Sequence, residues 1–257
     1  MAREAVRVVG WADEKREMLA DSLARPYPVT VPMVILMAIV PVYLFIPGAL
    51  PNRPLFVPEL ALDRRVPVVP AWSIIYGAVY SFLIVLPVLV VRQTAHIRRL
   101  YVAYLLVWIT AYVFFLLFPT VAPRPVSVVG DGFAVWSLRF LYSADPPSNC
   151  LPSLHVAHSF VSALSCYRVH RSLGVAAVFC ALLVGVSTVL SKQHYILDVL
   201  AGVLLASVAY VVVLRSCRRD QVPERDRLAA PVVAFGAAGI AGLGTACVWI
   251  TYRLNLW

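Results

Sequence analysis

The stretch from Ser172 to Leu214, "SLGVAAVFCALLVGVSTVLSKQHYILDVLAGVLLASVAYVVVL", decides the fold of this 257-residue chain. Its two flanks are hydrophobic runs of the kind that cross a bilayer as helices. Between them stand Lys192, His194 and Asp198, within seven residues of one another. Ionisable groups are costly beside lipid, so this short segment is a candidate functional site between two membrane helices.

The composition of the whole chain agrees with this interpretation. Hydrophobic residues make up 61% of the sequence and charged residues 14%, whereas an average soluble domain is about half apolar and about a quarter charged. The sequence therefore predicts an all-α, polytopic integral membrane protein with one membrane domain. The five cysteines are spread out and form no C-x-x-C pair, which argues against a zinc or redox centre.

We expect seven spans of about 20 residues, the length that a bilayer requires. They cover residues 29–49, 70–91, 99–118, 153–168, 172–190, 195–214 and 229–250. The fourth is short, and the fifth follows it after a tight turn. The first 28 residues carry five basic and five acidic residues, which is unlike a signal peptide. They form either an amphipathic surface helix or a solvated tail.

Charge predicts the orientation of the spans. With the N-terminus inside, the inner segments hold 15 of the 22 Lys and Arg residues and the outer segments hold 7. This bias predicts a multi-pass protein of the plasma or inner membrane, with a cytoplasmic N-terminus and an external C-terminus. The net charge of +9 does not indicate nucleic acid, because the basic residues collect beside the spans.

Two histidines and an aspartate form the candidate site. His194 and Asp198 are four residues apart at the start of a span, so they share one helical face. A carboxylate that holds one imidazole nitrogen leaves the other as a basic lone pair, although such a pair can also simply tie helices together. His155 opens the span 153–168, where free N–H groups attract anions. Two crossings separate the histidines, so we expect them on the same outer face, one or two helix diameters apart.

Two cations flank the same outer face. Arg124 lies in "FPTVAPRP" after the third span, and Lys192 precedes His194 by two residues. Each alone is an ordinary interface charge, but together with the histidines they suit transfer of a phosphoryl or phosphodiester group without a metal. His158, three residues after His155, could suggest a metal pair, but no third ligand has suitable spacing. We interpret His158 as a packed or substrate-facing residue.

These motifs resemble the type 2 phosphatidic acid phosphatase (PAP2) superfamily, which also contains inositol phosphorylceramide and sphingomyelin synthases. The family's P-S-x-H motif matches Pro152–His155, and S-R-x5-H-x3-D matches Ser187–Asp198 at its Ser, His and Asp. The K-x6-R-P motif matches only at Arg124 and Pro125. The resemblance covers roughly residues 58–215. It implies a six-helix core, to which the last predicted span is an addition.

Two departures affect the substrate. Leu117 stands where the first motif has Lys, and Thr188 stands where the third has Arg. A phosphomonoester dianion needs more positive charge than a phosphodiester monoanion, so the loss keeps headgroup transfer as a rival to dephosphorylation. Lys192 would replace one missing cation. The stretch "LDRRVPVVPAWSIIY" and the Arg124 loop resemble the inositolphosphotransferase-type branch.

The resemblance implies a role for each candidate residue. His194 would attack phosphorus and form a phosphohistidine, with Asp198 orienting it. His155 would protonate the leaving alkoxide and then deprotonate the acceptor. The phosphate oxygens would be held by three groups, namely Arg124, Lys192 and the backbone near Ser153. No cofactor or metal is implied.

The leading hypothesis is an enzyme that hydrolyses a lipid phosphate on the extracytoplasmic face, with a membrane lipid as substrate. A phospholipid headgroup transferase with an alcohol or lipid acceptor is the alternative, and a catalytically silent lipid-binding or transport protein is the third. The expected division is an N-terminal segment 1–28, a catalytic domain 29–215, a basic linker 216–228 and the last span with its tail, 229–257. The small-residue run "FGAAGIAGLGTA" permits close packing within the chain or in a homo-oligomer.

Overall fold

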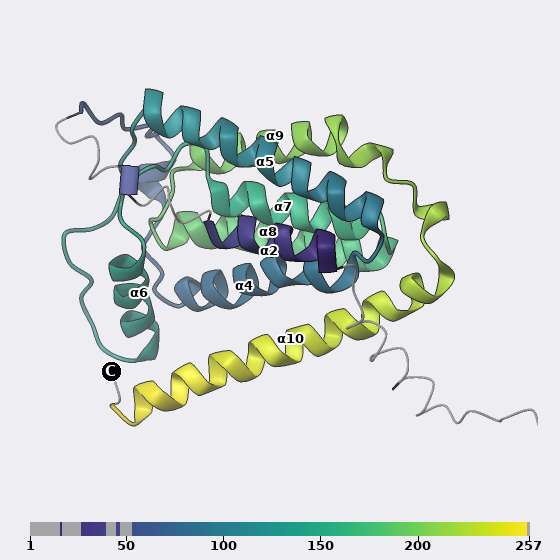
Figure 1. Cartoon of the computed structure of the whole chain (residues 1–257). Coiled ribbons are helices and arrows are strands. Elements are labelled where there is room, and N and C mark those ends of the chain that lie inside the picture. The colour runs from purple at the N-terminus through teal and green to yellow at the C-terminus, as the bar shows by residue number, and fades with distance from the viewer. Residues whose placement is uncertain (1–15, 17–26, 40–44, 47–52, 256–257) are drawn as a thin grey trace, which may run out of the picture.

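The computed structural model describes residues 16, 27–39, 45–46 and 53–255 (Figure 1). Their regular structure is helical, apart from two isolated bridges between loops. The α-helices are α2 (Tyr27–Ile39), α4 (Trp72–Val90), α5 (Thr94–Leu117), α6 (Phe133–Ala144), α7 (Leu154–Tyr167), α8 (Arg171–Leu190), α9 (Ile196–Val212) and α10 (Glu224–Arg253). Short 3-10 turns occupy Asp63–Arg65, Leu214–Ser216 and Arg219–Gln221. Four helices, α4, α5, α8 and α10, are long and apolar enough to cross a membrane, so the chain is an all-α membrane protein.

The predicted spans correspond to helices, with differences at their ends. Helices α4, α7, α8 and α9 begin and end within two residues of the prediction. Helix α5 begins five residues early, at Thr94, and α10 begins five residues early, at Glu224. Helix α2 covers the first part of the span 29–49, and most of its remainder lies outside the described residues. The alternatives for the first 28 residues also fall outside them, apart from Arg16 and the start of α2.

Helix α6 was not predicted. It lies in the segment 119–152, which we expected to be a loop, and its 12 residues are too few to cross a bilayer. Its rings stack in a row, with centroids 5.7 Å apart for Phe133 and Trp136 and 5.5 Å for Trp136 and Phe140. Figure 1 shows α6 beside the C-terminal end of α10, and Tyr252 of α10 lies 5.4 Å from both Phe133 and Trp136.

Helix α7 is the centre of the bundle. Eleven of its 14 residues are buried, although several of them are polar. Two of these polar groups find partners on α5: Ser162 Oγ lies 2.8 Å from Tyr104 Oη, and Ser165 Oγ lies 3.0 Å from His96 Nε2. A short, partly polar helix is stable here because α4, α5, α8 and α9 pack around it, and paired polar groups bear burial well.

Glycine allows α9 to approach α7 closely. A Cβ atom on Gly202 would lie 2.7 Å from the carbonyl oxygen of Ser153, a distance that real Cβ atoms do not adopt. The close approach lets the Ser153 N–H donate to the Asp198 carbonyl oxygen at 3.0 Å. The N-termini of α7 and α9 are therefore joined directly. Gly174, in the first turn of α8, permits the predicted tight turn between α7 and α8, because its Cβ position lies 2.2 Å from the Cα of Tyr167.

Candidate active site

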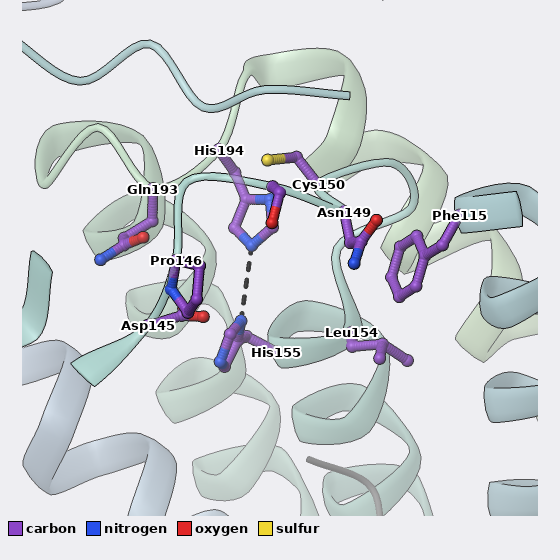
Figure 2. Close-up of a pocket in the computed structure, with 10 residues that line it drawn as sticks. Phe115, Asp145, Pro146, Asn149, Cys150, Leu154, His155, Gln193 and His194 are labelled. Atoms are coloured by element: carbon purple, nitrogen blue, oxygen red, sulfur yellow. Dashed lines mark hydrogen bonds between the residues drawn. The ribbon is translucent and has the colours of Figure 1, made fainter. Parts of the chain in front are cut away.

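The two candidate histidines face each other at the end of the bundle where α7 and α9 begin (Figure 2). His155 is the second residue of α7, and His194 lies in the turn between α8 and α9. Nδ1 of His155 is 3.4 Å from Nε2 of His194, and the ring centroids are 5.7 Å apart. The expectation of one or two helix diameters was therefore too large. The close contact of α9 with α7 at Gly202 brings the rings together.

Asp198 lies on the far side of His194 from His155. Its side chain is fully buried, and Oδ2 is 3.4 Å from Nδ1 of His194. The same oxygen accepts a hydrogen bond of 2.9 Å from the Tyr195 N–H, which closes the first turn of α9. A carboxylate at Nδ1 favours the tautomer that carries its proton there. The lone pair of His194 is then on Nε2, the atom that faces His155.

A second acid, which is not among the predicted site residues, fixes the turn that carries His194. Asp63 is buried, and its Oδ1 accepts a 2.9 Å hydrogen bond from the Ile196 N–H at the start of α9. Its Oδ2 accepts another, of 2.8 Å, from the Leu60 N–H. A carboxylate at a helix N-terminus also interacts favourably with the helix dipole. Asp63 is therefore a positioning residue for the His194 turn.

Two of the predicted phosphate ligands make other contacts. The Lys192 ammonium donates to the carbonyl oxygen of Asp63 at 3.1 Å. Ser153 is the N-cap of α7, and its buried hydroxyl oxygen accepts from the Val156 N–H at 3.4 Å. Neither residue lines the pocket between the histidines. Their assignment to phosphate binding stays a prediction.

Arg124 reaches the site through Gln193. Its guanidinium donates to the carbonyl oxygens of Tyr142 (3.0 Å) and Asp145 (2.5 Å) and to Oε1 of Gln193. It also lies over the Tyr142 ring, 4.6 Å from the centroid. Burial lowers the pKa of Arg124 from its ordinary value, but a guanidinium keeps its charge in proteins. A cation thus lies one side chain away from His194.

The pocket at the histidines is small. It encloses about 10 Å³, roughly the space of one water molecule. Its lining residues are Phe115, Asp145, Pro146, Ser148, Asn149, Cys150, Leu154, His155, Gln193 and His194. None of them is Lys or Arg, so the cations of the described site flank the pocket. Arg124 Nε and Gln193 Nε2 are buried N–H donors without an acceptor among the described residues, and such donors suit an anion.

Tyrosines from α4 surround His155. The rings of Tyr76 and Tyr80 lie 5.0 Å and 4.8 Å from the imidazole, centroid to centroid. The phenol oxygen of Tyr80 is also 3.4 Å from Nδ1 of His158. His158 is 3% exposed and packs edge-on against Tyr104 at 4.5 Å. His158 is therefore a packed residue, which is one of the two roles expected for it.

Comparison with known proteins identifies the family. The model of the PAP2 superfamily matches residues 48–212, a range that contains both histidines, both acids and Arg124.

The chain belongs to the PAP2 superfamily.

Two curated proteins are similar to parts of it. A PA-phosphatase related-family protein of Dictyostelium discoideum is 30% identical over 37% of this chain and 20% of its own length. An uncharacterised protein of Methanocaldococcus jannaschii is 28% identical over 40% of this chain and 41% of its own. The chain thus spans less than half the length of these relatives, and no solved structure matches it. Phosphatase-type chemistry for this chain is a prediction from its membership of the PAP2 superfamily. The inositolphosphotransferase branch stays a prediction.

One cluster in this PAP2 protein has the donor types of a metal site. The ligand atoms of Cys150, His194 and Asp198 lie within 4.8 Å of one another, and sulfur, nitrogen and oxygen donors are those that zinc uses. The sequence offered no spacing that would pair Cys150 with the others, because the fold brings them together. Burial raises the pKa of the Cys150 thiol, so metal binding would have to displace a firmly held proton. Metal independence therefore stays a prediction.

Proposed function

We propose that this PAP2 protein hydrolyses a lipid phosphate through a phosphohistidine on His194, at the extracytoplasmic face of the membrane. The observation that carries the proposal is the line of three side chains. Asp198 Oδ2 lies at one nitrogen of His194, and the other nitrogen faces His155, with 3.4 Å at each contact. A nucleophile, its orienting acid and a second proton-transfer group thus stand in sequence.

The first half of the reaction forms the phosphoenzyme. Nε2 of neutral His194 attacks phosphorus, and the bond from phosphorus to the lipid alcohol oxygen breaks. Protonated His155 gives its proton to the leaving alkoxide and becomes neutral. The His194 ring gains positive charge as its bond to phosphorus forms, and the Asp198 carboxylate stabilises that charge.

The second half releases phosphate. Neutral His155 takes a proton from water, and the water oxygen attacks the phosphorus held on His194. The bond between phosphorus and Nε2 breaks, which restores neutral His194 and leaves His155 protonated for the next cycle. Arg124, which flanks the pocket, and the amide of Gln193, which lines it, would hold the phosphate oxygens in both halves.

The reaction requires the site to open. Before attack, the phosphorus lies about 3–3.5 Å from the nucleophilic nitrogen. The leaving oxygen lies about 2.6–3.2 Å from the nitrogen of the general acid. His155 and His194 are too close to admit a phosphoryl group between nitrogens 3.4 Å apart. We infer that substrate binding separates the rings and that phosphate replaces the carbonyl oxygens on the Arg124 guanidinium.

The distribution of charge supports the extracytoplasmic side. The far end of the bundle carries an arginine cluster at the end of α7, the start of α8 and the segment after α9, namely Arg168, Arg171, Arg215 and Arg219. Such clusters remain on the cytoplasmic side. The site lies at the other end, where α7 and α9 begin.

Headgroup transfer is the second candidate, and the charge of the pocket favours it. Leu117 is 61% exposed, and the Thr188 hydroxyl donates to the Gly185 carbonyl oxygen at 2.7 Å. Neither position supplies a cation, and Lys192 is bound to Asp63. One guanidinium suits a phosphodiester monoanion better than a monoester dianion. In this reaction the phosphorus on His194 keeps its headgroup and the lipid alcohol leaves with the proton from His155. An acceptor alcohol then replaces water in the second half and takes the headgroup phosphate from His194.

A panel of labelled lipids tests the proposal. Purified full-length protein would be incubated with lipid phosphomonoesters and phosphodiesters, with and without alcohol acceptors, beside His194→Ala. We expect inorganic phosphate from a monoester, and none from His194→Ala. Transfer of a headgroup to alcohol without release of phosphate would establish the transferase instead. Lipid binding without turnover of any panel member would favour the silent protein and contradict the proposal.

A further inference from the structure

A larger cavity lies between α4, α6 and α10. Figure 1 shows α6 and the C-terminal end of α10 at the lower left. It has a volume of about 460 Å³. We call it the α10 groove. Its walls are Ser73, Ile74, Tyr76, Gly77, Ala78 and Ser81 of α4, Phe133, Trp136, Ser137, Phe140, Leu141 and Ala144 of α6, and Ala241, Gly244, Thr245 and Val248 of α10. None of these residues is charged.

One side chain joins the α10 groove to the active site. Tyr76 lines the groove, and its ring lies 5.0 Å from the His155 ring. Along α4 the groove extends from Ser73 to Ser81, which is about 12 Å at 1.5 Å per residue. It therefore begins at the level of His155 and descends along the spanning helices toward the apolar middle of the bundle.

Two glycines leave open space in the walls of the groove. A Cβ atom on Gly77 or on Gly244 would meet no atom within 4 Å, and these glycines belong to two different walls. The same holds for Gly236, Gly239 and Gly242. Within the part of the chain that the structure describes, the small-residue run in α10 thus makes no close helix contact at these glycines. Its role in a homo-oligomer stays a prediction.

Helix α10 lies beyond residue 212, where the superfamily match ends. The groove is therefore completed by a helix that this chain adds to the matched region. Most of α10 is exposed, with Phe235 83% and Leu243 68% accessible, as expected of a helix that faces lipid. An apolar groove beside such a helix can exchange contents directly with the bilayer.

We propose that the α10 groove holds one hydrocarbon chain of the lipid whose phosphate reacts at His194. This proposal rests on the proposed function, which assigns the phosphate of the lipid to His194. It adds a binding site for the hydrocarbon chain of the same lipid. An apolar cavity of roughly 150 Å³ accommodates six-carbon benzene, so 460 Å³ accommodates on the order of 18 carbons by the same measure. One chain fits and two do not. Tyr76 would lie at the junction between the chain and the headgroup.

The test fills the groove from two walls. Gly77→Leu and Gly244→Leu each add a side chain where space is open, and Gly239→Leu adds the same side chain on α10 away from the groove. The substrates are two lipid phosphates with the same headgroup, one with a chain of about 16–18 carbons and one with about four. We expect the ratio of kcat/KM for the long chain to that for the short chain to fall at least tenfold in both groove variants. Gly239→Leu should keep the wild-type ratio.

A second measurement separates this proposal from the proposed function. A long-chain phosphate with a photoreactive group near the end of its chain should label α4, α6 or α10, the three walls of the groove, in the wild type, and Gly244→Leu should lose the label. Labelling without turnover would support the groove as the site of the lipid chain and contradict the proposed phosphatase function. Turnover with an unchanged chain-length ratio in both groove variants, or labelling elsewhere, would overturn the groove.

Discussion

His194 owes its orientation to two acids from distant parts of the chain. Asp198 lies at its Nδ1, and Asp63 holds the first N–H of α9. Asp63 also receives Lys192 on its carbonyl oxygen, so the turn is held on both sides of the histidine. A reacting group that is fixed in this way loses little freedom on reaching the transition state. The contacts of this turn hold Nε2 of His194 in place facing His155.

Arg124→Ala should weaken both substrate capture and turnover. A charge-assisted hydrogen bond in a partly buried site contributes roughly 1.5–3 kcal/mol, which corresponds to roughly ten- to a hundredfold in kcat/KM. Arg124→Lys should recover part of the lost kcat/KM, because lysine keeps the positive charge but lacks the planar, bidentate guanidinium. Steady-state kinetics would measure both.

Arg139→Ala is the matched control for Arg124. Arg139 donates to the carbonyl oxygens of Val128 and Gly130, so it braces the same loop without touching the pocket. Its loss should leave kcat/KM close to that of the wild type. Equal effects of the two substitutions would show that the loop fold, and not the phosphate contact, sets the rate.

Activity should survive removal of divalent metal. The ligand atoms of Cys150, His194 and Asp198 are close enough to bind an ion. The proposed chemistry uses the Nε2 lone pair of His194 and proton transfer by His155, and no step in it requires a metal. We expect full turnover after treatment with a chelator, and the release of phosphate would measure it. Loss of activity in chelator, with recovery on added zinc that Cys150→Ser abolishes, would assign a metal site instead.

At the scale of elements, the join between α7 and α9 decides the geometry. Gly202→Ala would place a methyl group 2.7 Å from the Ser153 carbonyl oxygen, and overpacking of this kind costs about 1–3 kcal/mol. Helix α9 would move away from α7 and carry Asp198 with it. Because a shift of about 1 Å can cost on the order of a hundredfold in rate, kcat should fall by about ten- to a hundredfold.

Gly185→Ala is the control for Gly202. Its added methyl group would lie 3.4 Å from the Val199 side chain, an ordinary contact between α8 and α9. Circular dichroism and thermal unfolding would accompany the kinetics of both variants. Normal activity of Gly202→Ala would show that the active site does not depend on the α7–α9 contact.

The sequence predicts the elements better than their contacts. Long apolar runs place α4, α5, α8 and α10, since lipid requires such runs, and motif spacing places His155 and His194 at one end. Helix α6 was not predicted because its 12 residues form an amphipathic, aromatic helix within a segment that reads as a loop. The roles of Asp63 and Gln193 were not predicted for another reason. Asp63 accepts hydrogen bonds from backbone N–H groups, and Gln193 accepts one from Arg124. No sequence motif predicts such contacts.

At the scale of the whole molecule, the site and the C-terminal end of α10 share one side. Tyr252, near the end of α10, contacts Trp136 of α6 at 5.4 Å, and α6 lies at the active-site end (Figure 1). A reporter fused after Trp257 therefore reports the side of the active site as well. We expect it outside the cytoplasm, and a cytoplasmic signal would place the chemistry on the inner face.

The most direct test of the account is to trap the phosphoenzyme. The protein would be mixed with a lipid substrate labelled at phosphorus and quenched, and the adduct examined for acid lability and base stability. We expect such an adduct in the wild type and none in His194→Ala. In His155→Ala both formation and breakdown should be slow, because the same imidazole serves both steps. An adduct that persists in His194→Ala, or wild-type turnover by that variant, would contradict the account and leave His155, His194 and Asp198 as a structural clasp between helices.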